Sequence, residues 1–230
     1  MSNHEVANTR ALLIRLAGYT AHFRDPRTNT AKIGLPARTL HCPPPSTIHG
    51  LICAARGGWV EPDSLRLGWR MDYAGTNIDF QTSRLPQRKR ENGRLGTQTG
   101  ITISPVEREF LTFPVLSLLV ISGVDPVWFR SPVNPLSLGR SEDLIVEKRL
   151  QTVDVEVCSQ ASLSHQCLPV GLGSGTIYTA PLYFVEHRQA INMTVRVDAI
   201  HEQTVNSTEI VRVLQSKEAF YIWNFSTSAG

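Results

Sequence analysis

The sequence predicts an α+β protein in which strands outnumber helices. Apolar residues alternate with polar ones in several short segments, which is the pattern of half-buried strands. A single segment repeats its apolar residues at helical spacing, so one clear helix is expected among the strands. The chain has 230 residues, 41% of them hydrophobic and 19% charged, which is enough to bury a core and argues against disorder.

The first expected strand spans residues 11–23, which are apolar and lack helix caps. Leu12, Ile14 and Leu16 share one face of it, and its high apolar content is typical of a central strand. Pro26 ends the run, because proline cannot donate to the hydrogen bonds of a sheet.

The expected helix follows three prolines at residues 43–45. Ser46 is its predicted N-cap, and Gly57 and Gly58 end it. Its apolar residues recur at the i, i+3, i+4, i+7 positions of one helix face: Ile48, Leu51, Ile52 and Ala55.

Strands dominate the chain after this helix. Every second residue from 65 to 73 is apolar, which predicts a strand whose buried face consists of Leu65, Leu67, Trp69, Met71 and Tyr73. Residues 82–99 contain almost no apolar side chain and carry Asn92 and Gly93 at their middle. We expect this segment to be the tip of a long exposed hairpin.

The remaining chain is expected to form strands and loops. Pro114 interrupts an apolar strand at residues 110–123. The proline-containing segment 132–145 passes a tight turn at Gly139 into a predicted helical turn capped by Ser141. Three alternating runs follow, at residues 153–157, 191–197 and 219–225.

Positive charge is concentrated in the first half of the chain. Residues 1–110 contain 15 Lys and Arg against 9 Asp and Glu, whereas residues 111–230 contain 8 against 11. This asymmetry favours a surface that binds a polyanion, although many solvated faces have a similar composition. The expected hairpin tip has a single acidic residue, Glu91, among mutually repelling cations, which favours a polyanion over a solvated loop. These cations are Arg84, Arg88, Lys89, Arg90 and Arg94.

Basic and hydroxyl residues also gather where the first strand ends and the helix begins. Arg24 and Arg27 follow the strand, and Arg38 precedes the prolines. The first turn of a helix favours an anion through its unpaired backbone N–H groups and its dipole. Here that turn holds Ser46, Thr47 and His49. We therefore expect a phosphate held by arginines at this place, while a plain N-cap is the alternative role of Ser46.

The sequence contains no motif of a familiar enzyme class, such as a P-loop, HExxH or GxSxG. Three histidines, His22, His41 and His49, lie in or beside the basic region, so one of them could serve as the general base of metal-free RNA cleavage. Structural or surface histidines are the commoner alternative.

The cysteines predict neither a metal site nor another cofactor. They have no CxxC spacing and no neighbouring histidine pair, so buried free thiols are expected at Cys42, Cys53, Cys158 and Cys167. The first ten residues are polar, and no apolar run approaches the roughly 18 residues of a membrane-spanning helix. We therefore expect a cytoplasmic protein with no membrane partner.

Three runs of residues together resemble a known family. They are RLAGYTAHFRDP at 15–26, PPPSTIHGLICAARGG at 43–58 and NPLSLGRSEDLI at 134–145. Their order and separation are similar to those of the Cas-five family of CRISPR-associated proteins, a branch of the RAMP superfamily. The resemblance covers chiefly residues 11–60 and 130–150.

The resemblance implies a fold. The expected arrangement is a ferredoxin-like (RRM-like) domain at residues 1–125, from which a long β-hairpin, the thumb, protrudes at residues 76–113. A β-rich part at residues 126–230 completes the fold.

The resemblance also implies a function. The expected protein is a subunit of a Cascade surveillance complex, in a type I system similar to type I-B, that caps the five-prime handle of the crRNA. Its partners would be this handle, the large subunit and the backbone subunits, and its position also allows contact with target DNA near the PAM. By position, the implied RNA contacts are Arg24, Arg27, Arg38, Ser46, Thr47, His49, Arg84, Arg88, Lys89, Arg90, Arg94, Gly139, Arg140 and Ser141.

The family is divided on catalysis. One branch cuts precursor RNA with a tyrosine, a lysine and a histidine, and the other branches only bind RNA. In this sequence Lys89 is followed by Arg90, not histidine, and no tyrosine lies between Thr20 and Asp72. This departure favours a binding subunit without catalytic residues. The alternative is a metal-independent endoribonuclease that processes precursor crRNA, with His41 or His49 as its base.

Overall fold

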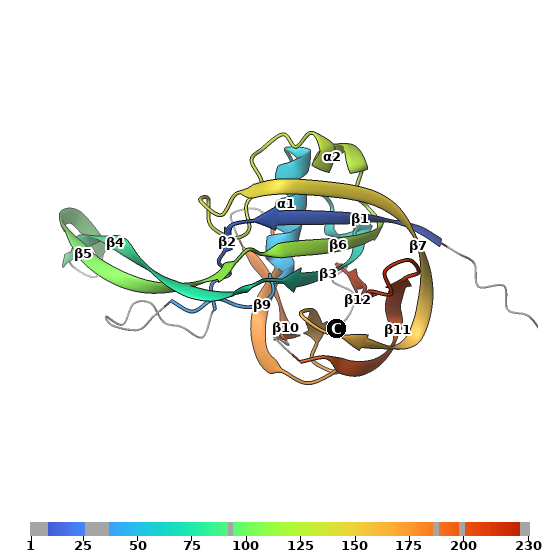
Figure 1. Cartoon of the computed structure of the whole chain (residues 1–230). Helices are drawn as coiled ribbons and strands as arrows, with labels where there is room; N and C mark the ends of the chain where they lie inside the picture. The colour runs from blue at the N-terminus through green and yellow to red at the C-terminus, as the bar shows by residue number, and fades with distance from the viewer. Residues whose placement is uncertain (1–8, 26–36, 92–93, 186–188, 198–200, 226–230) are drawn as a thin grey trace, which may run out of the picture.

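A seven-stranded antiparallel sheet is the central feature of the computed structural model, which describes residues 9–25, 37–91, 94–185, 189–197 and 201–225 (Figure 1). Each strand is hydrogen bonded antiparallel to its neighbours. In spatial order the strands are β12 (Ala219–Tyr221), β11 (Gln203–Val213), β7 (Ile145–Leu163), β1 (Thr9–Gly18), β6 (Val115–Ser122), β3 (Arg66–Asp72) and β13 (Trp223–Asn224).

Helices connect strands of this sheet that are not neighbours. α1 (Pro45–Arg56) lies between β1 and β3 in the chain, and α2 (Pro126–Arg130) lies between β6 and β7. The four middle strands therefore have the order β7-β1-β6-β3. A short 3-10 helix (Pro62–Ser64) precedes β3. No helix in the described ranges is long and apolar enough to cross a membrane.

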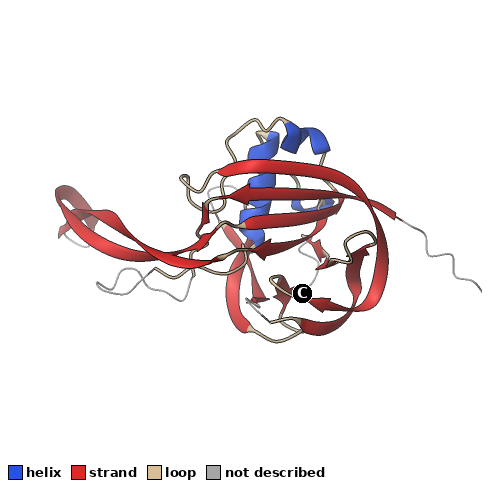
Figure 2. Cartoon of the chain, viewed as in Figure 1, coloured by secondary structure: helices blue, strands red, loops and turns tan. Residues whose placement is uncertain are grey.

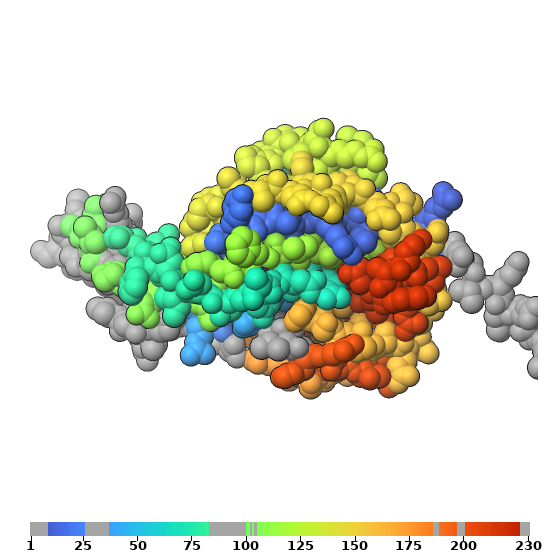
Figure 3. Space-filling model, in the orientation of Figure 1, coloured from blue at the N-terminus to red at the C-terminus, as the bar shows by residue number. Residues whose placement is uncertain are grey.

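Two three-stranded sheets adjoin the main sheet. One has the order β8 (Cys167–Pro169), β10 (Ala190–Val197), β9 (Thr176–Phe184), and the other β2 (Thr20–Ala21), β5 (Arg94–Thr112), β4 (Gly75–Glu91). β4 and β5 form a long hairpin that projects from the body of the molecule, as the ribbon in Figure 2 and the space-filling view in Figure 3 show.

The main sheet buries apolar side chains on both faces. On one face Ile14 and Leu16 of β1 join a core with Ile48 and Ile52 of α1, and β9 packs on the same helix. On the other face Leu13 joins a second cluster with residues of β6, β7, β11 and β12. β7, with 19 residues, curves around one end of the molecule and carries the chain to β11 (Figure 1).

The α+β composition with few helices is confirmed, and most predicted strands form. β1 is the fourth of seven strands, so the prediction of a central strand is confirmed. A bend at Tyr19 divides the predicted segment into β1 and β2. In β3, Leu67, Trp69 and Met71 are buried as predicted, and Pro114 separates β5 from β6.

The beginning of α1 differs from the prediction. The N-cap is Pro44, whose side chain makes no capping hydrogen bond, so the prediction of Ser46 as N-cap is wrong. Pro45 occupies the first helical position, where its fixed φ suits the helix and its missing N–H leaves one donor fewer to satisfy. Gly57 ends the helix in the left-handed conformation, with φ 81°, as predicted.

The predicted helical turn at Ser141 is also wrong. Residues 137–144 form a tight turn closed by a bridge between Ser137 and Leu144. The backbone N–H of Arg140 donates to the Asp143 carboxylate, so the acidic residue and not Ser141 holds this turn. The Ser141 side chain is exposed and contacts Glu142.

Candidate nucleic-acid interface

A cavity of about 500 Å³ lies where the end of β2, the last part of β5 at the base of the hairpin, the start of α1, the 137–144 turn and β9 meet. We call it the arginine cavity, because three of its lining residues are arginines: Arg24, Arg108 and Arg140. Around them the lining includes His22, Thr47, Gly139, Tyr178 and Phe184. Guanidinium groups beside hydroxyl and aromatic side chains suit the phosphates and bases of a single-stranded nucleic acid.

Arg108 reaches the cavity from β5. Its Nε is buried and makes no hydrogen bond within the described residues. Partial burial lowers the pKa of Arg108, and the positive charges of Arg140 and Arg24 lower it further. The carboxylates of Glu142 and Asp143 act in the opposite direction and offset part of this repulsion. The net lowering of the Arg108 pKa nevertheless indicates a site where a bound anion would stabilise the guanidinium.

Arg140 is held in the 137–144 turn by Asp143. Its Nε lies 2.9 Å from one carboxylate oxygen of Asp143 and its Nη2 lies 2.8 Å from the other. The Asp143 side chain is fully buried and also accepts a 2.6 Å hydrogen bond from the Thr20 hydroxyl. Burial acts to raise the pKa of Asp143, but the hydrogen bonds from Arg140 and Thr20 outweigh it, so the pKa lies below its ordinary value.

Gly139 brings this turn against the backbone of the first strand segment. It has φ 112°, and a Cβ at this position would lie 1.9 Å from the carbonyl oxygen of His22. The backbone N–H of His22 donates to the carbonyl of Leu138 at 3.1 Å. The turn can approach this closely only because residue 139 has no side chain.

His22 faces the cavity as a neutral ring. Its Nδ1 donates to the backbone carbonyl of Glu109 at 2.7 Å, which leaves Nε2 as an acceptor. Burial lowers its pKa from 6.5; the hydrogen bond to Glu109 acts in the opposite direction, and the charges of Arg108 and Arg140 lower the pKa again. The ring is therefore uncharged at pH 7 and adds no cation to the cavity.

Four of the residues predicted as RNA contacts come together here: Arg24, Thr47, Gly139 and Arg140. They belong to three segments that are far apart in the sequence, and the fold of β1, α1 and the 137–144 turn joins them. Arg108 has no local signal in the sequence, because it lies in a strand of alternating charge. Its place in the site follows from the pairing of β2 with β5.

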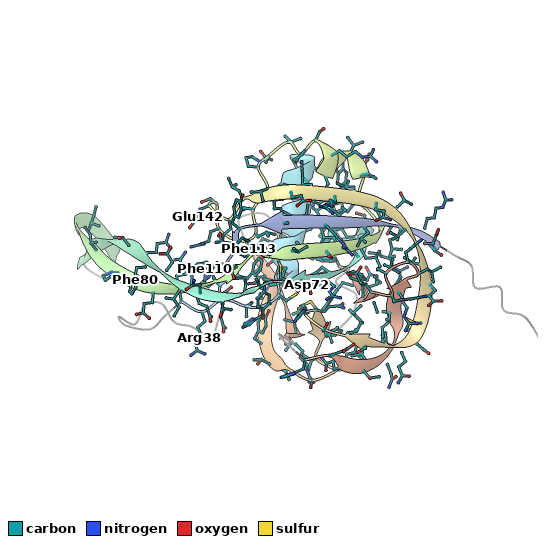
Figure 4. All side chains as sticks on the ribbon, viewed as in Figure 1. Arg38, Asp72, Phe80, Phe110, Phe113 and Glu142 are labelled. Atoms are coloured by element: carbon teal, nitrogen blue, oxygen red, sulfur yellow. The ribbon has the colours of Figure 1, made fainter. Side chains whose placement is uncertain are left out.

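Other predicted contacts lie outside the lining of the cavity. Arg38 is exposed at the base of the hairpin and points away from the body (Figure 4). Ser46 is half-buried in the first turn of α1, and Ser141 is exposed. Arg27 lies outside the described residues. The side chains of Arg84, Arg88, Lys89, Arg90 and Arg94 also fall outside what the structure describes, although their backbone belongs to β4 and β5.

His49 is not available to a ligand. Only 3% of it is exposed, and its Nε2 donates to the carbonyl of Val60 at 2.8 Å. The helical periodicity around Ile48 and Ile52 places the neighbouring His49 at the edge of the buried face, where Trp59 and Tyr183 pack against its ring. Burial therefore argues against the predicted RNA contact at His49.

The first turn of α1 also offers fewer donors than predicted. Pro44 and Pro45 have no backbone N–H, and the N–H of Thr47 is bonded to the carbonyl of Pro44 at 2.9 Å. Anion binding at this end of the helix therefore depends on side chains, mainly on the arginines and the Thr47 hydroxyl.

A second polar cluster lies at the root of the hairpin. His41 Nδ1 and the Tyr73 hydroxyl are hydrogen bonded at 2.6 Å. His165 Nδ1 lies 3.0 Å from the Asp72 carboxylate, which also accepts a 2.7 Å hydrogen bond from Arg70. We call these five residues the His41 cluster. Tyr73 lies one residue beyond the segment from Thr20 to Asp72, which contains no tyrosine.

The fold and the arginine cavity together define a class of protein, namely a β-rich α+β chain in which an antiparallel sheet supports a cationic cavity suited to phosphate groups. The family model described as CRISPR-associated protein (Cas_Cas5) matches residues 11–166, which is more than half of the chain. The chain therefore belongs to the Cas-five family of CRISPR-associated proteins.

One solved structure from a CRISPR complex is similar to this chain in fold, and two further CRISPR structures match it more weakly. A chain of the type III-B Cmr-beta complex bound to cognate target RNA has a TM-score of 0.53 at 9% identity, over 93% of this chain and 99% of that chain. A chain of a CRISPR RNA-guided surveillance complex has a TM-score of 0.46 at 16% identity, over 86% of this chain and 92% of that chain. A CRISPR protein from Archaeoglobus fulgidus has a TM-score of 0.48 at 12% identity, over 94% of this chain and 100% of that chain. No curated protein sequence matches the chain.

Proposed function

We propose that this chain is a non-catalytic subunit of a CRISPR surveillance complex and binds the five-prime handle of the crRNA in the arginine cavity. The observation that carries the proposal is the convergence of Arg24, Arg108 and Arg140 on one cavity, with the buried Nε of Arg108 lacking a partner within the described residues. Family membership supports it, and so does the fold shared with a chain of an RNA-bound Cmr complex.

The proposal includes a ferredoxin-like core with the hairpin as a thumb. The strand order β7-β1-β6-β3, with a helix after β1 and after β6, supports this core. The division into residues 1–125 and 126–230 remains a prediction; β7, from the second part, pairs with β1 from the first.

In the proposed mechanism Arg24 and Arg108 neutralise successive phosphates and Thr47 adds a hydroxyl contact. Arg140 is already paired with Asp143, so it contributes mainly by holding the 137–144 turn in place. Phe184, 43% exposed at the cavity, offers a face for a splayed base. We propose a type I-B-like system as the source of this complex. The proposed partners besides the handle are the large subunit, the backbone subunits and target DNA near the PAM.

Replacing both Arg24 and Arg108 by alanine should abolish tight handle binding. Loss of each arginine side chain should remove about 1.5–3 kcal/mol of binding free energy from charged hydrogen bonds. The affinity of the double variant should therefore fall at least about 100-fold at low salt. Two lost phosphate contacts should also reduce the slope of log K against log salt by about 1.4. Fluorescence anisotropy with labelled handle RNA at several salt concentrations measures both quantities.

Arg130→Ala is the matched control, because Arg130 is exposed at the end of α2 and does not line the cavity. Its affinity and salt slope should equal those of the wild type. An Arg24→Ala/Arg108→Ala variant that melts like the wild type and still binds the handle normally would contradict the proposal.

A second candidate function is metal-independent cleavage of precursor crRNA, and the His41 cluster is the observation that favours it. Burial lowers the pKa of His41. The charge of Glu109 acts to raise this pKa and that of His165 acts to lower it, and the net lowering keeps the ring neutral at pH 7. A neutral His41 can accept the proton of a ribose 2′-hydroxyl as that oxygen attacks the adjacent phosphorus. The 5′-oxygen would then leave with a proton from Tyr73 or His165, giving a cyclic phosphate and a 5′-hydroxyl.

Incubation with end-labelled repeat RNA in EDTA separates the two candidates. The binding proposal predicts intact RNA after one hour. Under the cleavage alternative the RNA is cut at one site, and Tyr73→Phe or His41→Ala slows cutting by about 10²- to 10⁴-fold while handle affinity is retained. Cutting of this kind would overturn the non-catalytic assignment.

A further inference from the structure

Two aromatic side chains, Tyr19 and Phe113, stand exposed together where β1 ends and β6 begins. Tyr19 is 67% exposed and Phe113 is 64% exposed. Their ring centroids are 6.5 Å apart with an angle of 76° between the planes, and the N–H of Phe113 donates to the carbonyl of Tyr19 at 2.9 Å. The two rings therefore form a corner that is open to solvent and fixed through the backbone.

Folding alone does not account for phenylalanine at position 113. Phe113 has φ 48°, in the left-handed region that a bulky residue occupies only at a cost and that glycine adopts freely. Its exposed ring recovers little of this cost through burial. Strained backbone of this kind is concentrated at functional sites, where the side chain is needed in that position.

The aromatic corner is connected directly to the arginine cavity. β2 pairs with β5 through Thr20–Thr112 and Ala21–Leu111. The corner lies at one end of this short ladder, and His22 and Arg108, which line the cavity, lie beyond the other end. Three residues from Tyr19 to His22 correspond to about 10 Å of extended chain, a separation that a short run of unstacked nucleotides can span.

The corner and the cavity also share a structural support. Thr20, next to Tyr19, donates to the Asp143 carboxylate that holds Arg140. Figure 4 shows Phe113 near the point where the hairpin leaves the body, on the side where Glu142 of the 137–144 turn lies. The Asp143 carboxylate that holds Arg140 thus also anchors the backbone segment next to Tyr19.

We propose that Tyr19 and Phe113 form a base-stacking subsite for one unstacked nucleobase of the single-stranded RNA whose phosphates bind in the arginine cavity. This proposal rests on the proposed function and adds a site to it. With the planes at 76°, a base can stack on one ring while its edge meets the other ring, and stacking of this kind tolerates any base. Proximity to the arginines favours RNA over a partner protein as the occupant.

Handle RNA carrying 2-aminopurine at one position at a time tests the subsite, with the full-length chain as binder. When the wild type binds, the 2-aminopurine fluorescence should fall below that of free RNA at the position whose base occupies the corner. Phe113→Gly should remove this quenching and weaken binding about tenfold, while its melting temperature stays equal or rises because glycine relieves the left-handed backbone. Tyr19→Ala should weaken binding similarly and provides a second variant if Phe113→Gly fails to fold.

Val157→Ala is the control, because Val157 is 68% exposed on β7 and lies outside both the corner and the cavity. If Tyr19→Ala and Phe113→Gly keep wild-type affinity and quenching, the stacking subsite is wrong while RNA binding stands. If the wild type binds no handle RNA, the proposed function itself fails. If the variants bind RNA normally but lose co-purification with other complex subunits, the corner is a protein contact and the subsite is overturned.

Discussion

Gly139→Ala is expected to destabilise the chain by about 3 kcal/mol or more. The new Cβ would meet the His22 carbonyl oxygen at 1.9 Å, and the backbone at φ 112° is unfavourable for any residue with a side chain. Because the contact is with backbone, no side-chain rotation can relieve it. For a chain of this length the melting temperature should fall by roughly 6–12 °C, measured by circular dichroism.

Gly50→Ala is the matched control for this change. A Cβ on Gly50 meets no atom within 4 Å, and alanine favours the helical conformation of α1. This variant should therefore be more stable than the wild type by up to about 1 kcal/mol. If Gly139→Ala melts at the wild-type temperature, the close approach of the 137–144 turn to His22 is incorrect.

Gly139→Ala should also reduce RNA binding, although glycine has no side chain to contact RNA. The turn must move away from His22 to make room for the methyl group, and Arg140 moves with it. Comparing affinity at a temperature where both proteins are folded separates this displacement from simple unfolding.

Arg140→Ala is expected to destabilise the chain by about 3–5 kcal/mol at pH 7. The substitution leaves the fully buried Asp143 carboxylate without its cationic partner. Urea unfolding at pH 7 measures the difference. The control is Arg149→Ala, which breaks the pair between Arg149 and Glu147, whose side chains are 78% and 52% exposed, and should cost less than about 1 kcal/mol.

The loss of stability caused by Arg140→Ala should become smaller as the pH falls. In the wild type the pKa of Asp143 is lowered, so the stability from its ionised form is present above the unfolded value of about 3.9 and is lost as the pH falls through the lower folded value. In the variant, burial dominates and raises the pKa of Asp143. The stability difference between the two proteins should therefore shrink from pH 7 to pH 4. An equal difference at both pH values would contradict this account of the turn.

Local sequence patterns predicted the elements that local chemistry determines. The alternation of Leu67, Trp69 and Met71 identified β3, and Gly57 identified the end of α1. The start of the helix was missed, because the fixed φ of Pro45 replaced the expected side-chain cap. The helix periodicity placed His49 only at the edge of the buried face, and its near-complete burial depends on Val60 and Tyr183, which meet it only in the folded chain.

The sequence predicted those residues of the candidate site that lie within recognisable sequence motifs. Arg24, Thr47, Gly139 and Arg140 could be named from their segments, although their convergence depends on the fold. Arg108 could not be named, because its role follows from a ladder between residues 90 positions apart, such as Ala21 and Leu111. The contact between His41 and Tyr73 likewise joins residues 32 positions apart.

The strand β7 supplies a neighbour to β1 along its first part and to β11 along its last part. During synthesis, β1 therefore lacks both partners until β6 has left the ribosome, and it lacks β7 until residue 155 has emerged. Its free edge is a template for pairing with other nascent chains over that interval. We expect this edge to stay unpaired until the first part of β7 emerges, so slower synthesis should lengthen the time during which nascent chains can associate.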